Sequence, residues 1–364
     1  MSNYDQFLFT NGVLFPPADT PPVATVLQAY PGAYTTTRTH HNGAEILFWE
    51  RHLSRLSNSM KLLLRAKPEL LFKTREPVIP FVDSMAKSFS WDSLISGLVN
   101  DYMGKALSYV TKERCFQEEM SITTLVCGNL DVLEEDDDLD EERIARAFDV
   151  YLHFGRYVPR VFGADRHGNR LAVVGHGRDV ANAKYSDWVR LRKNLERLRP
   201  PSTSELLLSN DGDHILEGCL TNFFVVCCKD GVENTDQKKY SDFIRFLEVQ
   251  TAPLKDGVLP GVIRQAIIEV CSNIGIPLRE VSPSWSQNKL WKEAFTTNSL
   301  RLLEHAETIM VPSSWDALGL KSWMDVIWEE KQFEVGPGRI TSIIQKEVMK
   351  MADTEGYPVV SLKQ

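Results

Sequence analysis

The 364-residue sequence lacks the features that mark membrane and secreted proteins. Its apolar runs, such as Phe223 to Cys228, are far shorter than the ~20 residues that a membrane-spanning helix needs. The first residues show no basic stretch followed by an apolar one, and no Asn-x-Ser/Thr glycosylation sequon occurs. We therefore expect a cytoplasmic protein that is not embedded in a membrane.

Cysteine is also scarce, and acidic residues outnumber basic ones. The six cysteines form no CxxC pair and no disulfide-like framework, so we expect reduced, mostly buried thiols. The net charge of −8 argues against a nucleic-acid or anionic-membrane partner, because either would need clustered basic residues. On a strand, the adjacent pairs His40-His41 and Cys227-Cys228 would face opposite sides, so we expect no metal site. Chemistry on a small molecule is the favoured function.

What the sequence does contain is enough apolar residues for two domains, with 43% hydrophobic and 25% charged residues. Asn42-Gly43 predicts a hairpin between two short apolar runs, and the spacing of Leu53, Leu56 and Met60 predicts a helix. A further helix is expected over residues 81–106 and a strand over residues 120–126. The fold class is α/β or α+β, with a domain boundary that divides the chain into residues 1–165 and 166–364.

The second part begins with a predicted strand, Leu171 to Val174. We expect three further elements: a helix from Lys184 to Leu198, a hairpin from Glu205 to Val226 that turns at Asp211-Gly212, and a helix that opens at Pro260-Gly261 and ends at Gly275. Residues 293–300 are expected to form a hydroxyl-rich break after a helix.

Glu217 stands out because the strand around it is otherwise apolar. A carboxylate in such a strand costs several kcal/mol unless it is paired or protonated, and a pyridinium would supply a partner. Lys184 offers an amine that can form an imine. The first amides of the helix that opens at Pro260-Gly261 can point at an anion such as a phosphate, and Arg55 can bind a phosphate bidentately.

The order of these motifs resembles the class IV aminotransferase family. The chain carries Arg-His-Leu-x-Arg-Leu from Arg51, Lys184, Glu-x-x-x-x-Asn-x-Phe from Glu217, Gly-Val-Leu-Pro-Gly-x-x-Arg from Gly257 and Phe-x-Thr-Asn-Ser from Phe295. This family comprises the fold-type IV pyridoxal 5'-phosphate (PLP) enzymes, among them branched-chain and D-amino-acid aminotransferases and 4-amino-4-deoxychorismate lyase. The resemblance spans roughly residues 7 to 310.

This resemblance implies a small N-terminal α/β domain, a larger C-terminal domain with a pseudo-barrel sheet, and a homodimer with PLP between the domains. Lys184 would form the Schiff base and Glu217 would contact the pyridine nitrogen. Arg55, Ser299 and the amides of Val262 and Ile263 would hold the phosphate. The substrate would be a small amino-acid-like molecule, with contacts expected from Tyr34, Arg38 and Arg301.

Three departures from the family pattern concern the substrate side and the phosphate. Ile263 stands where threonine is usual, so a hydroxyl is lost there while the amide remains. Asp187 and Trp188 follow Lys184 where asparagine or tyrosine is typical. The strand at residues 121–127 lacks the arginine with which branched-chain aminotransferases bind the substrate carboxylate.

Two reactions therefore stay open. Transfer of an amino group between an amino acid and a 2-oxo acid through a Lys184 Schiff base is favoured, because it is the broader activity of the family and because residues 134–142 insert an acidic run. The alternative is a lyase that releases pyruvate, because residues 33–38 resemble the lyase's Phe-Thr-Thr-x-Arg stretch, in which Thr36 would assist proton transfer. A third possibility is a catalytically impaired PLP-binding paralogue.

Overall fold

The computed structural model describes residues 6–15, 17–72, 90–113, 118–129, 141–164, 167–228, 246–315 and 322–362. The chain divides into two compact units. Unit 1 comprises Met1–Pro159, Asn182–Leu191 and Thr354–Gln364, and unit 2 comprises Arg160–Ala181 and Arg192–Asp353. The first segment of unit 1 ends at Pro159, six residues before the expected boundary at 165 (165 − 159). The chain passes between the units more than once, and the segment that contains Lys184 belongs to unit 1.

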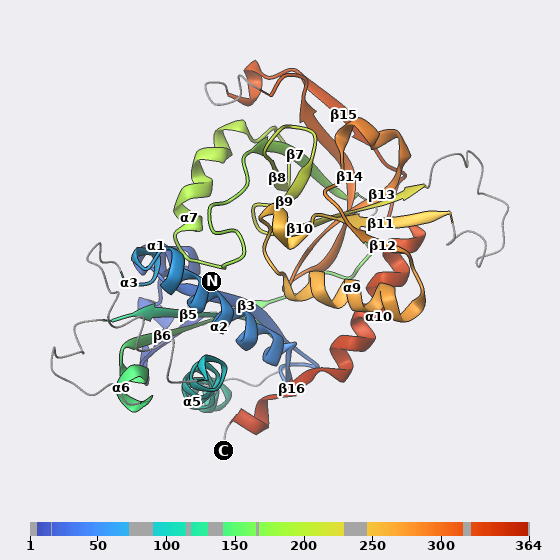
Figure 1. Ribbon diagram of the computed structural model, residues 1–364. Helices are drawn as coiled ribbons and strands as arrows, with labels where there is room; N and C mark the ends of the chain where they lie inside the picture. Colours follow the sequence, from blue (N-terminus) through green and yellow to red (C-terminus); the bar gives the residue numbers. More distant parts are fainter. Residues whose placement is uncertain are drawn as a thin grey trace. The chain divides into compact units, whose positions relative to one another are not determined.

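Unit 1 is built on a seven-stranded sheet in the order β16-β4-β3-β5-β6-β1-β2 (Figure 1). The predicted hairpin is confirmed, since β3 and β4 pair antiparallel and are joined by residues 41–44, of which 41–43 have positive φ. The strands are β1 (Gln6–Thr10), β2 (Val13–Phe15), β3 (Ala33–His40), β4 (Glu45–Leu47), β5 (Glu119–Gly128), β6 (Phe148–Tyr157) and β16 (Gly356–Pro358).

Helix α2 (Trp49–Ala66) packs on β3 and presents Leu53, Leu56 and Met60 to the core, as their spacing predicts. Helix α5 (Trp91–Glu113) contains residues 91–106 of the expected helix, and residues 81–89 of that prediction lie outside the described residues. The other helices among the described residues of unit 1 are η2 (Pro17–Asp19), α1 (Val23–Ala29), α3 (Glu69–Phe72), α6 (Glu141–Arg146), α7 (Trp188–Leu191) and η9 (Val359–Leu362).

Unit 2 contains a nine-stranded sheet in which six strands close into a barrel-like ring. The ring runs β10-β13-β14-β7-β8-β9, and the pairing of β9 with β10 at Glu217 and Asn222 closes it. This agrees with the expected pseudo-barrel sheet. The strands are β7 (Asn169–Gly175), β8 (Glu205–Ser209), β9 (Ile215–Gly218), β10 (Asn222–Cys228), β11 (Leu247–Thr251), β12 (Leu278–Glu280), β13 (Trp291–Asn298), β14 (Leu302–Pro312) and β15 (Trp328–Gln332).

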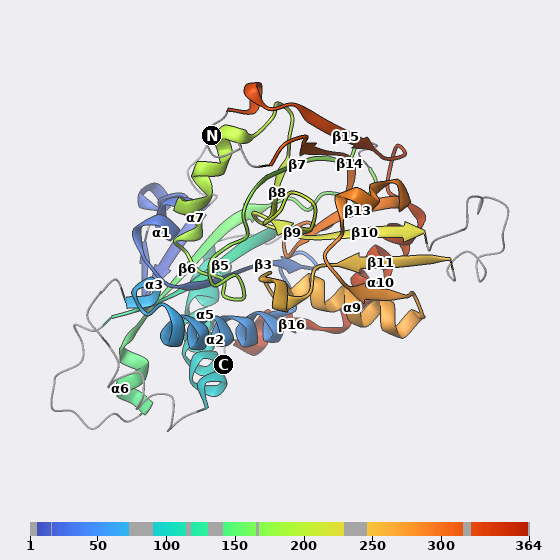
Figure 2. The same ribbon diagram turned by 45° about the horizontal axis from the view of Figure 1, so that its top comes forward.

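Helix α9 (Val262–Ile274) packs against β12 and β13 and lies beneath β10 and β11 in Figure 2. Its predicted end at Gly275 is confirmed, because this residue is the C-cap with φ 72°. The other helices of unit 2 are η4 (Arg192–Leu198), η5 (Leu254–Asp256), η6 (Trp285–Leu290), η8 (Trp323–Asp325) and α10 (Arg339–Thr354).

Two predictions about elements are wrong. Lys184 does not begin a helix, because Tyr185 beside it bridges to Ala33, and the helical segment from Trp188 turns 3₁₀ at Arg192. Residues 293–300 are not a break after a helix, because most of them form β13, whose Phe295 stacks on Phe224 of the neighbouring strand. The predicted hairpin at residues 205–226 contains a third strand, β10.

In the described part of the chain, no helix combines the length and apolar character needed to cross a membrane. Five cysteines are described there, and each is a buried free thiol, as expected. The sixth, Cys115, and most of the acidic run, residues 134–140, lie outside the described residues.

Candidate active site

Lys184 lies in unit 1, fixed by its backbone between β3 and α2. Its carbonyl accepts a 2.9 Å hydrogen bond from the amide of Tyr34, and its amide donates to Ser59 Oγ at 3.1 Å. The side chain is half-buried, with Nζ 4.5 Å from the centre of the Tyr34 ring. The face of an aromatic ring attracts a cation. The backbone therefore holds this amine at a defined place on the β3 side of unit 1.

Arg55 is buried on α2 and is tied to the same segment through Ser59. Ser59 Oγ donates a 2.9 Å bond to the carbonyl of Arg55, while it accepts the amide of Lys184. Arg55 Nη2 donates to Thr35 Oγ1 at 2.6 Å and lies 3.4 Å from His52 Nδ1. The expected phosphate-binding arginine and the expected Schiff-base lysine therefore share one hydroxyl.

His52 is fully buried beside this arginine. Burial lowers the pKa of His52 well below its ordinary value, and the charges of Arg55 and Lys184 lower the pKa further. Thr35 Oγ1 lies 2.7 Å from its Nδ1. The imidazole is therefore neutral at physiological pH.

The other residues expected from β3 are Tyr34, Thr36 and Arg38, which alternate along the strand and so share one face. Thr36 Oγ1 lies 3.0 Å from Thr123 Oγ1 on the paired strand β5. Arg38 is buried, donates to the carbonyl of Thr39 at 3.1 Å, and lies 5.9 Å from the centre of the Tyr157 ring. Burial lowers the pKa of Arg38, whereas Tyr157 and Glu119 oppose that shift.

In unit 2, Glu217 is a buried carboxylate paired with Arg178. Arg178 Nε donates to Glu217 Oε1 at 2.9 Å, and the two side chains are only 4% and 2% exposed. Glu217 Oε2 accepts the amide of Leu259 at 2.9 Å and Nδ2 of Asn222 at 3.4 Å. The sequence predicted a paired carboxylate here, and the described part of the chain already supplies a cationic partner.

The amino end of α9 is built next to this acid. Asn222 Nδ2 also donates to the carbonyl of Leu259 at 2.9 Å, two residues before the N-cap Gly261. A side chain at position 261 would overlap Asn222 Oδ1, which explains the glycine there. Val262 and Ile263 are buried in the first turn, where helix amides have no intrahelical acceptor. This end of the helix is suited to bind an anion.

Asn222 on β10 pairs with Thr297 on β13 and with Glu217 on β9. Directly paired residues lie on the same face of a sheet, so the three side chains share one face. Thr297 is buried, and its Oγ1 has no hydrogen-bond partner among the described residues. It is one of several buried hydroxyls without a partner among the described residues, and it differs from most of them by lying beside Asn222 and Glu217. Sequence reasoning had singled out Ser299 instead.

Ser299 and Arg301 lie in the turn that joins β13 to β14. Asn298 Oδ1 shapes this turn by accepting the amides of Leu300 and Arg301 at 3.0 and 2.9 Å. Ser299 is half-buried. Arg301 Nη1 donates to Glu304 Oε2 at 2.6 Å, so the guanidinium expected to bind substrate is engaged in an ion pair.

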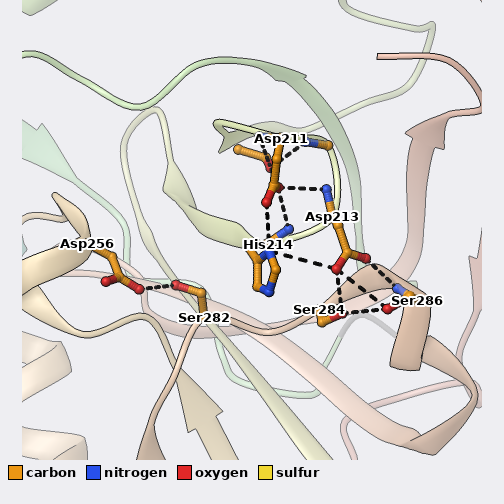
Figure 3. Close-up of polar contacts among 9 residues, drawn as sticks. Asp211, Asp213, His214, Asp256, Ser282, Ser284 and Ser286 are labelled. Carbon is orange, nitrogen blue, oxygen red and sulfur yellow. Dashed lines mark hydrogen bonds and ion pairs between the residues drawn. The ribbon is translucent and has the colours of Figure 1, made fainter. Parts of the chain in front are cut away.

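Figure 3 shows two groups of polar contacts, one around the turn before β9 and one beside the loop before α9. Asp211 caps the β8–β9 turn by accepting the amides of Asp213 and His214, and its Oδ2 lies 2.7 Å from the imidazole of His214. This contact with Asp211 raises the pKa of His214. Asp213 in turn accepts the hydroxyl of Ser284 at 2.7 Å, and Asp256 accepts Ser282 at 2.8 Å. The contacts of Asp211 and Asp213 anchor the turn before β9, and the bond between Ser282 and Asp256 anchors the segment that leads to α9.

The expectation that His40 and His41 face opposite sides is wrong. His41 leaves the strand with φ 54°, and the two ring centroids lie 4.0 Å apart. The period-two argument holds only within the strand, which ends at His40.

Sequence reasoning missed the roles of four residues: Thr35, Ser59, Arg178 and Thr297. A lone arginine six residues before Lys184 (184 − 178) carries no recognisable signal. His52 and Asn222 belonged to the quoted motifs, but no role followed from the motif alone. These contacts join residues far apart in sequence, which no local pattern reports.

Comparison with known proteins addresses the resemblance directly. Residues 174–305 match the family model for amino-transferase class IV, and this range contains Lys184, Glu217, the start of α9 and Ser299. The predicted resemblance is confirmed over these residues, and the motif that begins at Arg51 lies outside the matched range. Among curated proteins nothing matches the sequence.

Solved class IV aminotransferases share the fold. A branched-chain amino acid aminotransferase from Thermobaculum terrenum in its PLP form aligns with a TM-score of 0.62 at 14% identity, over 98% of this chain and 99% of that one. The branched-chain aminotransferase of Escherichia coli aligns at 0.59 with 18% identity, over 96% of each chain. A PLP-bound hypothetical aminotransferase from Mycobacterium tuberculosis aligns at 0.57 with 14% identity, over 96% and 99%. The expected fold-type IV architecture is confirmed by these alignments.

Proposed function

We propose that this protein is a PLP-dependent aminotransferase that moves an amino group between an amino acid and a 2-oxo acid. The observation that carries the proposal is the buried carboxylate of Glu217, which accepts three hydrogen bonds. A carboxylate offers about four acceptor positions, so one remains for a protonated ring nitrogen. The class IV family match and the PLP form of a solved structure with this fold support the choice of cofactor.

The donor set of the chain fits PLP. Arg55, the amides of Val262 and Ile263 and the hydroxyl of Ser299 would hold the phosphate, and the orphaned Oγ1 of Thr297 is a further candidate donor. Ile263 supplies no hydroxyl, so its contribution is limited to the amide.

The bound cofactor would withdraw electrons from the substrate carbon. Lys184 would bond to it through Nζ and, once displaced, would carry a proton on that nitrogen. Proton transfer requires the amine to be neutral for part of the cycle. Glu217 would keep the ring nitrogen protonated. We further propose a small amino-acid-like substrate and a homodimer, as the family resemblance implies.

A lyase that releases pyruvate remains the second candidate, and one observation favours it. Thr36 lies two residues along β3 from Tyr34, whose ring contacts Lys184 Nζ, and residues two apart on a strand share a face. Its hydroxyl therefore faces the same side as the proposed proton carrier. A catalytically impaired PLP-binding paralogue is the third candidate.

Borohydride reduction tests the shared premise. Purified protein supplied with PLP should become coloured, and reduction followed by peptide mapping should place the label on Lys184, with Lys184→Ala remaining unlabelled. A protein that stays colourless with PLP, or a label on another residue, contradicts all three candidates.

Substrates then separate the candidates. Conversion of the bound cofactor to its amine form by an amino acid supports amine transfer. Pyruvate release from aminodeoxychorismate without that conversion supports the lyase. A coloured protein that responds to no amine in a panel supports the impaired paralogue.

A further inference from the structure

Thr35 links the buried imidazole of His52 to the guanidinium of Arg55 by two short contacts. Arg55 Nη2 donates to Thr35 Oγ1 at 2.6 Å, and the same oxygen lies 2.7 Å from His52 Nδ1. A guanidinium has no lone pair to accept with, so the threonine oxygen must be the acceptor of the first bond. Its single proton is then available for the second bond.

The direction of the second bond follows from the same donor. Arg55 Nη2 also lies 3.4 Å from His52 Nδ1, and this contact is favourable only if that nitrogen carries a lone pair. Thr35 therefore donates to Nδ1, and the neutral ring carries its proton on Nε2. Burial and the charges of Arg55 and Lys184 hold the pKa of His52 far below 6.5, in agreement with this neutral form.

The other ring nitrogen of His52, Nε2, makes no hydrogen bond to the described residues. His52 is 0% exposed. A 180° flip of the ring would put Cδ2 in the place of Nδ1 and lose both contacts, so the contacts at Nδ1 set the orientation of the ring. Buried donors without partners are rare and call for a reason.

We infer that His52 and Thr35 are positioning residues that hold the Arg55 guanidinium in one orientation for an anionic group, the phosphate of the cofactor. The inference rests on the proposed function, in which Arg55 binds that phosphate. Two further contacts agree with it: Ser59 bonds to the carbonyl of Arg55 and to the amide of Lys184. The arginine that would bind the phosphate and the lysine that would bind the aldehyde are thus fixed together within unit 1.

Thr37 is a matched control for Thr35. Both threonines are fully buried and lie on the same face of β3, but Thr37 Oγ1 donates its proton to the carbonyl of Leu47 at 2.8 Å. Thr35→Val and Thr37→Val each remove one buried hydroxyl of the same kind. Any general loss of stability should therefore be similar in the two variants.

The test compares the affinity of the whole apoprotein for PLP with its affinity for pyridoxal, which lacks the phosphate, by fluorescence titration. We expect Thr35→Val to weaken PLP binding about tenfold or more while pyridoxal binding changes less than about threefold. Thr35→Ser should restore PLP affinity, and Thr37→Val should leave the ratio of the two affinities as in the original protein. His52→Leu should reproduce the effect of Thr35→Val.

Two results would overturn the inference in different ways. If Thr35→Val and Thr37→Val give the same ratio of PLP to pyridoxal affinity, His52 and Thr35 do not position Arg55. If the unaltered protein itself binds PLP no better than pyridoxal, the phosphate site and the proposed function fail together. Should Thr35→Val not fold, Thr35→Ser and His52→Leu carry the comparison.

Discussion

Arg178 and Glu217 form a buried ion pair in which Nε lies 2.9 Å from Oε1, with 4% and 2% of the two side chains exposed. Arg178 Nη2 also donates to the carbonyl of Ala181 at 2.6 Å, three residues before Lys184 in the chain. One guanidinium therefore fixes both the acid and the segment that leads to the lysine.

Arg178→Met should destabilise the protein by about 3–5 kcal/mol, because it leaves the charge of Glu217 buried without its partner. The free energy of unfolding in urea measures this. Arg178→Met with Glu217→Gln should recover most of the loss, since neither charge then remains. Arg279→Met removes an exposed arginine paired with Glu248 at 3.0 Å and should cost no more than about 1 kcal/mol. Equal losses for Arg178 and Arg279 would contradict the expectation.

Glu205 should make stability fall with rising pH. Its burial raises its pKa from 4.5 to about 7, against the opposing effects of the Leu206 amide, Arg301, Arg199 and Thr221. Because the folded-state value is the higher one, its contribution is complete below pH 4.5 and is lost as pH rises through about 7. Relative to Glu205→Gln, the protein should lose about 3 kcal/mol between these limits. The free energy of unfolding in urea, measured against pH, tests this. A difference between the two proteins that stays constant from pH 4.5 to pH 7 would refute it.

Ile263→Thr should strengthen PLP binding roughly threefold to tenfold by adding a hydroxyl at the amino end of α9. The apoprotein should be less stable, because a hydroxyl replaces a buried apolar side chain. Ile267→Thr, one turn further along and equally buried, should lower stability without any gain in affinity. Fluorescence titration with PLP and unfolding of the apoproteins measure both effects. A gain at position 267 as large as that at 263 would count against a phosphate site there.

Thr36→Val separates the two candidate reactions. If the hydroxyl assists proton transfer in a lyase, pyruvate release should fall by ~10²-fold or more. If the protein is an aminotransferase, amine transfer should stay within about tenfold of the original rate. Thr123→Val removes the hydroxyl 3.0 Å away and is the control for packing. Equal losses in both variants would assign Thr36 a structural role only.

The sequence predicted the elements whose signal is local. Asn42-Gly43 allows a tight turn, Gly275 allows a positive φ at a helix end, and Leu53, Leu56 and Met60 repeat at helical spacing. Residues 293–300 misled because threonine and asparagine are typical of loops. Their strand is stabilised by pairing with β10 and β14, which lie far away in sequence.

The candidate site also depends on contacts between residues that lie far apart in the sequence. Glu217 was conspicuous because a carboxylate in an apolar strand needs a partner, but the identity of that partner depends on how Arg178 folds back. Lys184 became conspicuous only through the family resemblance. The roles of Thr35, Ser59 and Thr297 depend on strand register and helix packing, which a single sequence does not encode locally.

The ladder that joins β9 to β10 has Glu217 and Asn222 as its paired residues. The pairing that closes the ring therefore also places this carboxylate beside Asn222. Unit 2 cannot complete its barrel without also preorganising this carboxylate, so little reorganisation energy should remain to be spent when a ligand arrives.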